Sequence, residues 1–253
     1  MRKIKKTKVH IVNMGSSHFY ILQNKLIKYK SNIIEIIFEK EYIDSDVFML
    51  EDENKIINHN DILEHFNNLN IDNKTDIYIL LTDYNTEANY GGCLTNDNKE
   101  RIFYLSFSKT KDIIVEANIS LVNFLLIAIY RDVFRYLCKY AIRHDESELC
   151  IFDTSKNEKI KLLSLSCNKP SICKNCKEII MQKLNSNNLP VEYYNYLEKE
   201  IKKLKKELYY RILDLINENS KLTLIIVIFG PIILSILASV FYDIIKCLIK
   251  FLF

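Results

Sequence analysis

Glycine is scarce in this chain, with only four among 253 residues. The stretch Gly15-Ser16-Ser17 lacks the Gly-Lys pair of a P-loop and the later glycines of a dinucleotide fingerprint. Both motifs need those glycines so that the backbone can approach a phosphate, and both are therefore excluded. There are three prolines and no tryptophan, whereas isoleucine, lysine and asparagine are abundant. Because of that bias, lysine and asparagine counts say little about function.

Histidine and net charge are low as well. The chain has five histidines and nowhere reads His-Glu-x-x-His, and no spacing supports a Ser-His-Asp or Cys-His arrangement. The formal net charge of +3 is too small to predict a nucleic-acid partner. Residues 1–8 are basic, but no long apolar run follows them. This excludes a secretory signal and indicates a solvated approach to the first strand.

The hydrophobic content of 49% and charged content of 26% predict a folded domain with a buried core. Apolar runs predict strands, and helical spacing predicts the segments between them. The predicted strands are 9–14, 33–38, 76–82 and 101–107, and the predicted helices are 18–29, 60–69 and 119–141. We expect residues 85–97, with Gly91-Gly92, to form a loop. Strands that alternate with helices predict an α/β fold over residues 1–143, a two-layer or three-layer mixed sheet with flanking helices.

A membrane anchor is predicted near the C-terminus. Residues 222–242 contain no charged side chain, and a membrane-spanning helix needs about 20 such residues. Pro231 predicts a kink. Residues 243–253 are too short to cross again and suit an interfacial helix. We divide this part of the chain into a linker and juxtamembrane helix (185–220) and a transmembrane anchor with a short tail (221–253).

The lysines that flank the span predict its orientation. Two follow it, Lys246 and Lys250, and more precede it. The upstream lysines are Lys202, Lys203, Lys205, Lys206 and Lys221. The positive-inside rule then gives a single-pass protein of the cell membrane with its N-terminal domain in the cytoplasm.

Seven cysteines without a secretory signal indicate reduced thiols or metal ligands. The pair Cys173-x-x-Cys176 can hold one tetrahedral ion, and His144 and Cys150 complete a donor set that favours zinc. Cys167 is a rival for the fourth ligand. Four protein ligands leave no open position, so we predict a structural zinc knuckle over residues 144–184. The alternatives are buried free thiols beside a surface histidine, or a redox Cys-x-x-Cys.

The order of these parts, over residues 76–184, resembles archaemetzincin-like zinc metallopeptidases. Those enzymes carry a catalytic helix with His-Glu-x-x-His, a third histidine and then a structural cysteine cluster. Here the long helix has Arg131 and Arg135 where two imidazoles are needed, and a guanidinium cannot bind a cation. The resemblance therefore implies a degenerate, non-proteolytic member that keeps its structural zinc.

Two groups of residues are candidates for binding an anion. Ser16 and Ser17 precede a predicted helix, whose N-terminus attracts negative charge. Arg131 and Arg135 lie four residues apart on the long helix. The alternatives are ordinary helix capping for the serines and a solvated face with ion pairs for the arginines.

A charged helix over 191–219 leads towards the membrane. Its apolar residues are spaced close to a heptad seam, Leu197, Ile201, Leu204, Leu208, Ile212 and Leu215. This spacing predicts a homo-oligomer through residues 194–216, or packing on the soluble domain. A helix lying on an anionic membrane is a third interpretation.

Taken together, the sequence predicts a membrane-anchored, zinc-stabilised sensor or interaction protein without catalysis of its own. The sequence does not identify its small-molecule ligand. A bacterial defence or stress role rests only on analogy with proteins in which a cytosolic sensor sits on a membrane effector. The first rival is a membrane-tethered zinc metallopeptidase, which needs a second metal with an open position. The second is a sensor of a nucleotide second messenger, which needs a deep pocket at the carboxyl ends of the strands.

Overall fold

The computed structural model describes two compact units, Met1–Lys206 and Glu207–Phe253, each of which is taken by itself. The described residues are 4–39, 56–68, 77–87, 91–94, 101–108, 110, 120–144, 150–153, 170–204, 212, 216 and 219–252. The first unit contains a sheet with its helices, and the second contains the helix α9 (Ser220–Leu252).

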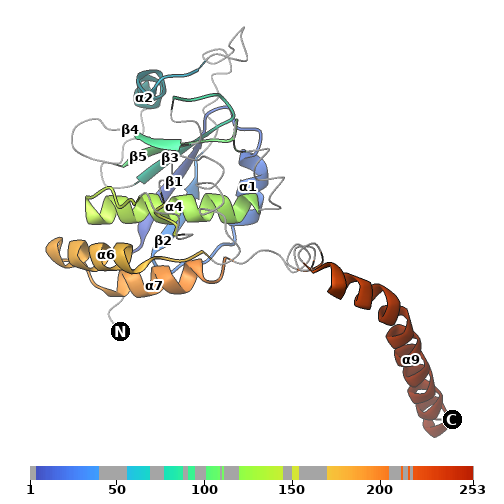
Figure 1. Ribbon diagram of the computed structural model, residues 1–253. Helices are drawn as coiled ribbons and strands as arrows, with labels where there is room; N and C mark the ends of the chain where they lie inside the picture. Colours follow the sequence, from blue (N-terminus) through green and yellow to red (C-terminus); the bar gives the residue numbers. More distant parts are fainter. Residues whose placement is uncertain are drawn as a thin grey trace. The chain divides into compact units, whose positions relative to one another are not determined.

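The sheet has five strands in the order β2-β1-β3-β5-β4 (Figure 1). They are β1 (Thr7–Asn13), β2 (Ile34–Phe38), β3 (Ile77–Thr82), β4 (Gly91–Leu94) and β5 (Ile102–Ser106). β1 runs parallel to β2 and β3, β5 runs parallel to the central strand β3, and β4 is antiparallel to β5. The predicted mixed α/β sheet is therefore confirmed.

The loop predicted over residues 85–97 is wrong in part, because β4 lies inside it. Two glycines discourage a strand prediction, since they have no side chain to pack. The structure shows why a glycine suits this place. A Cβ on Gly92 would lie 2.9 Å from the ring of Tyr104 on the paired strand, so any larger residue would require that buried ring to shift.

Helices cover both faces of the sheet. Alternate strand residues such as Ile11 and Ile79 pack against α1 (Phe19–Leu26) and α4 (Leu121–Cys138). The residues between them, such as Leu80, pack against α2 (His59–Asn68) on the other face. This is the period-two pattern of a sheet buried on both sides.

Two further helices, α6 (Lys174–Ser186) and α7 (Glu192–Ile201), lie next to α4 (Figure 1). As a result α4 is buried almost all round, and residues 124–130 are all inaccessible. This explains why its first half is so apolar. The backbone leaves α4 through Lys139, which has a left-handed φ of 49°.

The helix predicted over 191–219 is shorter in the structure, because α7 ends at Ile201 and turns follow it. Leu197, Ile201 and Leu204 are buried in the core of the first unit. Of the alternatives for this segment, packing on the soluble domain is the one found at these three positions. Leu208 and Leu215 lie outside the described residues, and Ile212 is exposed. Self-association through the rest of 194–216 stays a prediction.

A buried carboxylate fastens α7 to the sheet unit. The side chain of Glu200, only 4% exposed, accepts hydrogen bonds from the hydroxyls of Ser31 and Tyr130, each at 2.5 Å. Its other oxygen accepts from the backbone amide and the side-chain amide of Asn32, at 2.6 and 2.9 Å. Tyr29 bonds Tyr130 at 2.8 Å. The network joins α7 to α4 and to the turn before β2.

In the second unit, α9 includes a span of 20 residues, Val227–Lys246, with a mean hydropathy of 2.1 and none of it buried. It is long and apolar enough to cross a membrane. Pro231 lies inside the helix. The tail predicted as a separate interfacial helix is instead continuous with α9, which runs to Leu252.

Candidate metal centre

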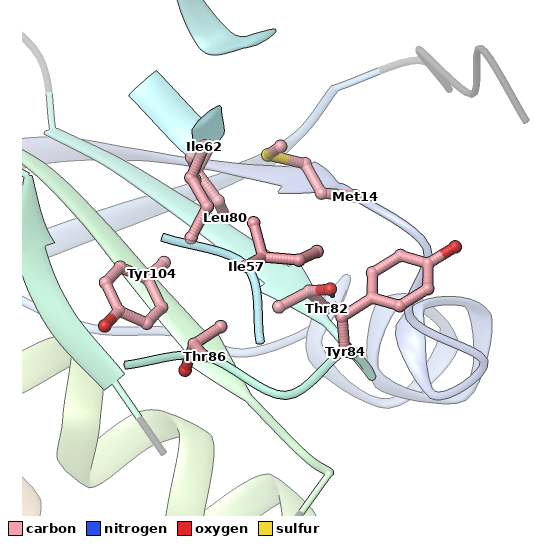
Figure 2. Close-up of a pocket in the computed structure, with 8 residues that line it drawn as sticks. All are labelled: Met14, Ile57, Ile62, Leu80, Thr82, Tyr84, Thr86 and Tyr104. Atoms are coloured by element: carbon pink, nitrogen blue, oxygen red, sulfur yellow. Dashed lines mark hydrogen bonds between the residues drawn. The ribbon is translucent and has the colours of Figure 1, made fainter. Parts of the chain in front are cut away.

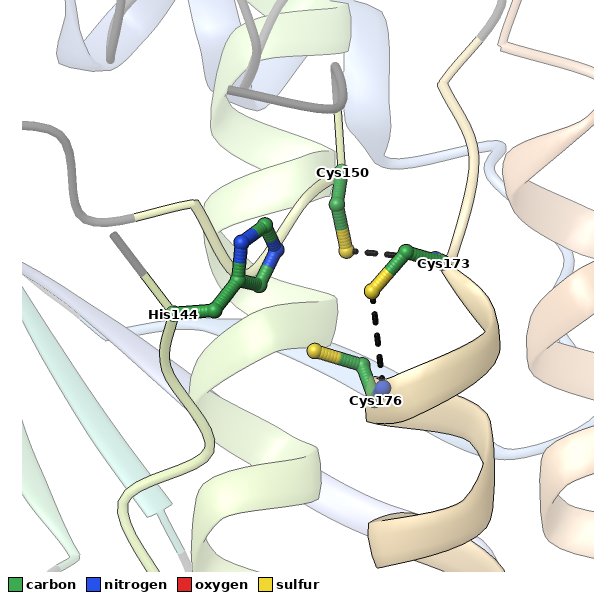
Figure 3. Close-up of side chains that lie close together, drawn as sticks. All are labelled: His144, Cys150, Cys173 and Cys176. Carbon is green, nitrogen blue, oxygen red and sulfur yellow. Dashed lines mark hydrogen bonds between the residues drawn. The ribbon is translucent and has the colours of Figure 1, made fainter. Parts of the chain in front are cut away.

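Four side chains converge between the end of α4 and the start of α6 (Figure 3). They are His144, Cys150, Cys173 and Cys176, and their ligand atoms all lie within 4.8 Å of one another. These are the four ligands predicted from the sequence, brought together from three separate segments. The rival ligand Cys167 lies outside the described residues.

Short backbone pairings hold the segments in place. His144 pairs with Asp153, and Cys150 pairs with Ser171, in isolated parallel bridges. The amide of Ile151 donates to the carbonyl of Ser171 at 3.0 Å. Cys150 is therefore fixed beside the segment that leads into Cys173, although more than twenty residues of chain separate them.

The Cys-x-x-Cys pair stands at the N-terminus of α6, with Cys173 in the extended segment just before the helix and Cys176 in its first turn. Cys173 is the N-cap residue, and its sulfur accepts a hydrogen bond from the amide of Cys176 at 3.4 Å. The amide of Cys173 donates in turn to the sulfur of Cys150, also at 3.4 Å (Figure 3). The thiol performs the capping role that serine usually has, so α6 begins at Lys174, between the two cysteines.

The proton balance of the cluster favours one thiolate. The pKa of Cys150 is lowered to about 5, chiefly because the thiol of Cys176 donates to it. Backbone amides and His144 add to this effect, and burial opposes it. The pKa of Cys176 is raised for the same reason, and burial raises that of Cys173. A bound metal would displace the protons that these two thiols keep.

The donor set fits zinc. Three sulfurs and one imidazole nitrogen are ligands that favour this ion. At a zinc–sulfur distance of about 2.3 Å, tetrahedral geometry puts the sulfurs about 3.8 Å apart. Against the 4.8 Å limit found here, the ligands need to move together by about 1 Å at most. Four protein ligands fill the tetrahedron, so such an ion would cross-link the chain and present no open position to a substrate.

Ser16 and Ser17, predicted to bind an anion, contact a carboxylate of the chain itself. Asp83, just after β3, accepts from the Ser17 amide at 2.9 Å and from the Ser17 hydroxyl at 2.5 Å. It also accepts from the Ser16 hydroxyl at 3.1 Å. Asp83 was missed in the sequence. The signal that could have found it is that parallel strands β1 and β3 end at one edge of the sheet.

The same cluster contains a serine, a histidine and an aspartate, but it is not a nucleophilic triad. The Nδ1 atom of His18 lies 3.2 Å from the Ser17 hydroxyl and 3.4 Å from the Asp83 carboxylate. A proton relay needs the serine and the carboxylate on opposite nitrogens of the ring. Here both contact the same nitrogen, so the imidazole cannot pass a proton between them.

Arg131 and Arg135 make contacts within the fold. The Arg131 guanidinium pairs with the neighbouring carboxylate of Asp132 at 3.1 Å. The Arg135 guanidinium lies 6.0 Å from the centre of the Phe103 ring. The Arg131–Asp132 ion pair agrees with the alternative interpretation, in which this helix face carries ordinary ion pairs and binds no anion. Burial raises the pKa of Asp132 more than the two arginines lower it.

A small apolar pocket lies under α2 near the carboxyl ends of β1 and β3 (Figure 2). Its cavity of about 10 Å³ is close to the minimum that one water molecule needs. The Thr86 hydroxyl beside it is buried and has no hydrogen-bond partner among the described residues. The lining residues are Met14, Ile57, Ile62, Leu80, Thr82, Tyr84, Thr86 and Tyr104. A pocket of this size does not admit a nucleotide.

No protein-family model matches the chain, and no curated protein matches it. Among solved structures, the chain is similar to archaemetzincin from Archaeoglobus fulgidus, crystallised with malonate, at a TM-score of 0.36 and 12% identity. The match covers 68% of this chain and 99% of that one. A TM-score this low supports no conclusion about shared fold or function. The cysteine cluster and the apolar helix are therefore interpreted from their own residues.

Proposed function

We propose that this chain is a membrane-anchored interaction protein whose α/β unit is stabilised by one structural zinc ion. The ligands are His144, Cys150, Cys173 and Cys176. The observation that carries the proposal is that three sulfurs and one imidazole lie within 4.8 Å of one another. Donors of this type rarely converge in a reduced protein without an ion to bind.

The ion would act as a cross-link. His144 follows α4 and Cys176 lies in the first turn of α6, so binding both fixes the C-terminal end of one helix to the N-terminal end of the other. Structural zinc sites in small peptides contribute roughly 10–16 kcal/mol of apparent binding free energy, which is also folding free energy. We therefore expect metal removal to loosen the packing of α6 and α7 on α4.

The second part of the proposal is the membrane anchor. It is supported by the length and apolar character of Val227–Lys246. The lysines before this span outnumber those after it, so we place the first unit in the cytoplasm. The protein would then hold an α/β unit at the inner membrane surface.

We propose no catalytic activity for this protein. α4, where an archaemetzincin-like enzyme would carry its zinc-binding histidines, contains no histidine. We infer that any relation to those peptidases is that of a member which has lost proteolysis and kept the cysteine cluster. The nucleotide-sensor alternative is disfavoured by the carboxylate of Asp83, because it occupies the Ser17 donors and repels phosphate.

Nothing in the structure supports the defence or stress setting, and we do not propose it.

Elemental analysis tests the zinc site. The full chain is purified in detergent, together with a Cys173→Ser/Cys176→Ser variant and a Cys93→Ser control. Cys93, on β4, is a half-buried cysteine outside the cluster and forms no disulfide. We expect one zinc per chain in the parent and the control, and none in the double variant. We also expect a chelator to lower the unfolding temperature of the parent but not that of the double variant.

Two results contradict the proposal. A parent without zinc removes the structural site. Two metals per chain, one of them retained by the double variant, point to a second site with an open position and revive the peptidase. The membrane anchor is tested separately by alkaline carbonate extraction, which leaves a spanning protein in the pellet and releases a peripheral one.

A further inference from the structure

The fold gathers exposed lysines from three distant segments at the amino edge of the sheet. We propose that this surface, named the lysine edge, binds the anionic headgroups of a phospholipid membrane. It consists of Lys5, Lys6, Lys8, Lys30, Lys202 and Lys203, all of them exposed. The inference rests on the proposed membrane anchor and adds a specific lipid contact to it.

Backbone contacts bring the three segments together. The amide of Thr7 donates to the carbonyl of Ile33 at 2.9 Å, which joins the start of β1 to the turn before β2. The hydroxyl of Tyr193, on α7, donates to the carbonyl of Lys5 at 2.6 Å. Glu200 joins the end of α7 to Asn32. The lysines are thus presented by a rigid surface and not by a loose tail.

Among the residues that the structure describes, few acidic side chains balance the charge of the lysine edge. Glu35 stands opposite Lys8 in the register of β1 and β2, and Glu198 pairs with Lys202 at 2.8 Å. Within the part of the chain that the structure describes, Lys5, Lys6, Lys30 and Lys203 have no acidic partner at ion-pair distance. Such a surface attracts a negatively charged partner.

The positive-inside rule does not account for this arrangement. That rule concerns lysines within about 15–20 residues of a membrane span. Lys5, Lys6 and Lys30 lie near the other end of the chain and reach this edge only through folding. Folding brings the segments that carry them against α7, the helix that leads to Lys203, and insertion of the span does not require this.

The chain geometry favours a membrane as the partner. Leu204, the residue after Lys203, is the last one that the structure describes before residue 212, so the chain continues towards α9 from a residue next to the lysine edge. Residues 205–219 separate Leu204 from α9 and reach at most about 50 Å. A tether this short keeps the surface at high effective concentration beside the bilayer. The cytoplasmic leaflet carries the anionic lipids that lysines bind.

A fluorescence experiment on the full chain tests the contact. The sequence has no tryptophan, so Ile27→Trp introduces one reporter at a side chain that is 71% exposed, three residues before Lys30. The protein is reconstituted into vesicles of phosphatidylcholine, alone or with phosphatidylserine, that contain a dansyl headgroup acceptor. We expect more energy transfer with phosphatidylserine, and loss of the difference at high salt, which screens exposed charges.

Matched variants locate the surface. Lys6→Gln/Lys203→Gln removes two charges from the lysine edge. Lys139→Gln/Arg143→Gln removes two exposed charges just after α4. The first pair is expected to lower the ratio of docked to undocked protein about 30-fold, given the usual contribution of each lysine near an anionic surface. The second pair is expected to leave it unchanged.

The outcomes separate the two proposals. If carbonate extraction releases the protein from the vesicles, the anchor fails. If the protein stays inserted but energy transfer is the same in both lipids, the anchor stands and the lysine edge is overturned. Equal losses in the two variants also overturn it, because the effect then depends on net charge and not on this surface.

Discussion

Removal of the buried carboxylate of Glu200 is expected to destabilise the first unit strongly. The side chain accepts four hydrogen bonds, two of them from hydroxyl groups at 2.5 Å. In Glu200→Ala, the hydroxyls of Ser31 and Tyr130 lose this acceptor in a region that water does not reach. The turn at Asn32 loses its attachment to α7 as well.

The magnitude follows from the number of donors left behind. Each buried polar group without a partner costs about 1–3 kcal/mol. Breaking a buried charged network by removing one member typically costs about 3–5 kcal/mol. For a domain near 200 residues, each kcal/mol lowers the unfolding temperature by about 2–4 °C. We therefore expect Glu200→Ala to unfold roughly 10 °C below the parent.

Circular dichroism melting of the full chain measures this shift, and a neighbouring glutamate is the control. Glu198 lies on the same helix and pairs with Lys202 in an exposed i,i+4 contact. Such pairs contribute about 0.3–0.5 kcal/mol, so Glu198→Ala is expected to melt close to the parent. A double-mutant cycle of Glu200→Gln with Tyr130→Phe is expected to give a coupling energy of about 1 kcal/mol or more.

Equal and small shifts for Glu200→Ala and Glu198→Ala would refute the reasoning. In that case α7 would be held by its apolar face alone, and the carboxylate network would contribute nothing measurable. A coupling energy near zero would refute the direct link between α7 and α4 in the same way.

Three further changes have defined outcomes. Burial raises the pKa of Tyr130 above its usual 10.0, so the fold keeps the phenol neutral and loses stability as the pH rises beyond 10.0; Tyr130→Phe is expected to flatten this alkaline loss in urea titrations. The pKa of Asp132 is raised above 3.8, so its charge costs stability at neutral pH; Asp132→Asn is expected to raise the urea midpoint at pH 7, with the gain disappearing below pH 3.8. Gly15 has a φ of 83°, and a Cβ there would lie 2.8 Å from the Tyr84 ring, so Gly15→Ala is expected to cost about 1–2 kcal/mol. Gly230→Ala, with no atom within 4 Å of the added Cβ, is its control, and equal midpoints for the two alanine variants would contradict the strain.

Much of the sheet could be predicted because its strands are buried on both faces. β3 is inaccessible along its whole length and reads as a continuous apolar run in the sequence. The edge strand β4 has no such signal. Its Gly91-Gly92 pair has low strand propensity, and the reason for a glycine, the ring of Tyr104, is visible only once the two strands are paired.

The metal cluster could be predicted because two of its four ligands lie close together in the sequence. Cys173 and Cys176 are three residues apart, and this spacing alone suggests a shared ion. Asp83 has no local signal, since its contact with Ser17 depends on the order of strands in the sheet. The seam at Leu197 and Ile201 was ambiguous for another reason. Spacings of three and four residues fit any buried helix face, whether the partner is another chain or the same one.

The attachment of α7 also determines how the protein would bear mechanical load. A pull on residues 205–219 enters the first unit at the end of α7. There it meets the carboxylate of Glu200 and its bonds to the turn before β2. The load then acts on the edge strand β2 and on α4, through hydrogen bonds that break over small extensions. The cysteine cluster lies at the start of α6, two helices and a loop away from that point along the chain. We expect tension from the membrane side to detach α7 first, while the clamp between α4 and α6 stays closed.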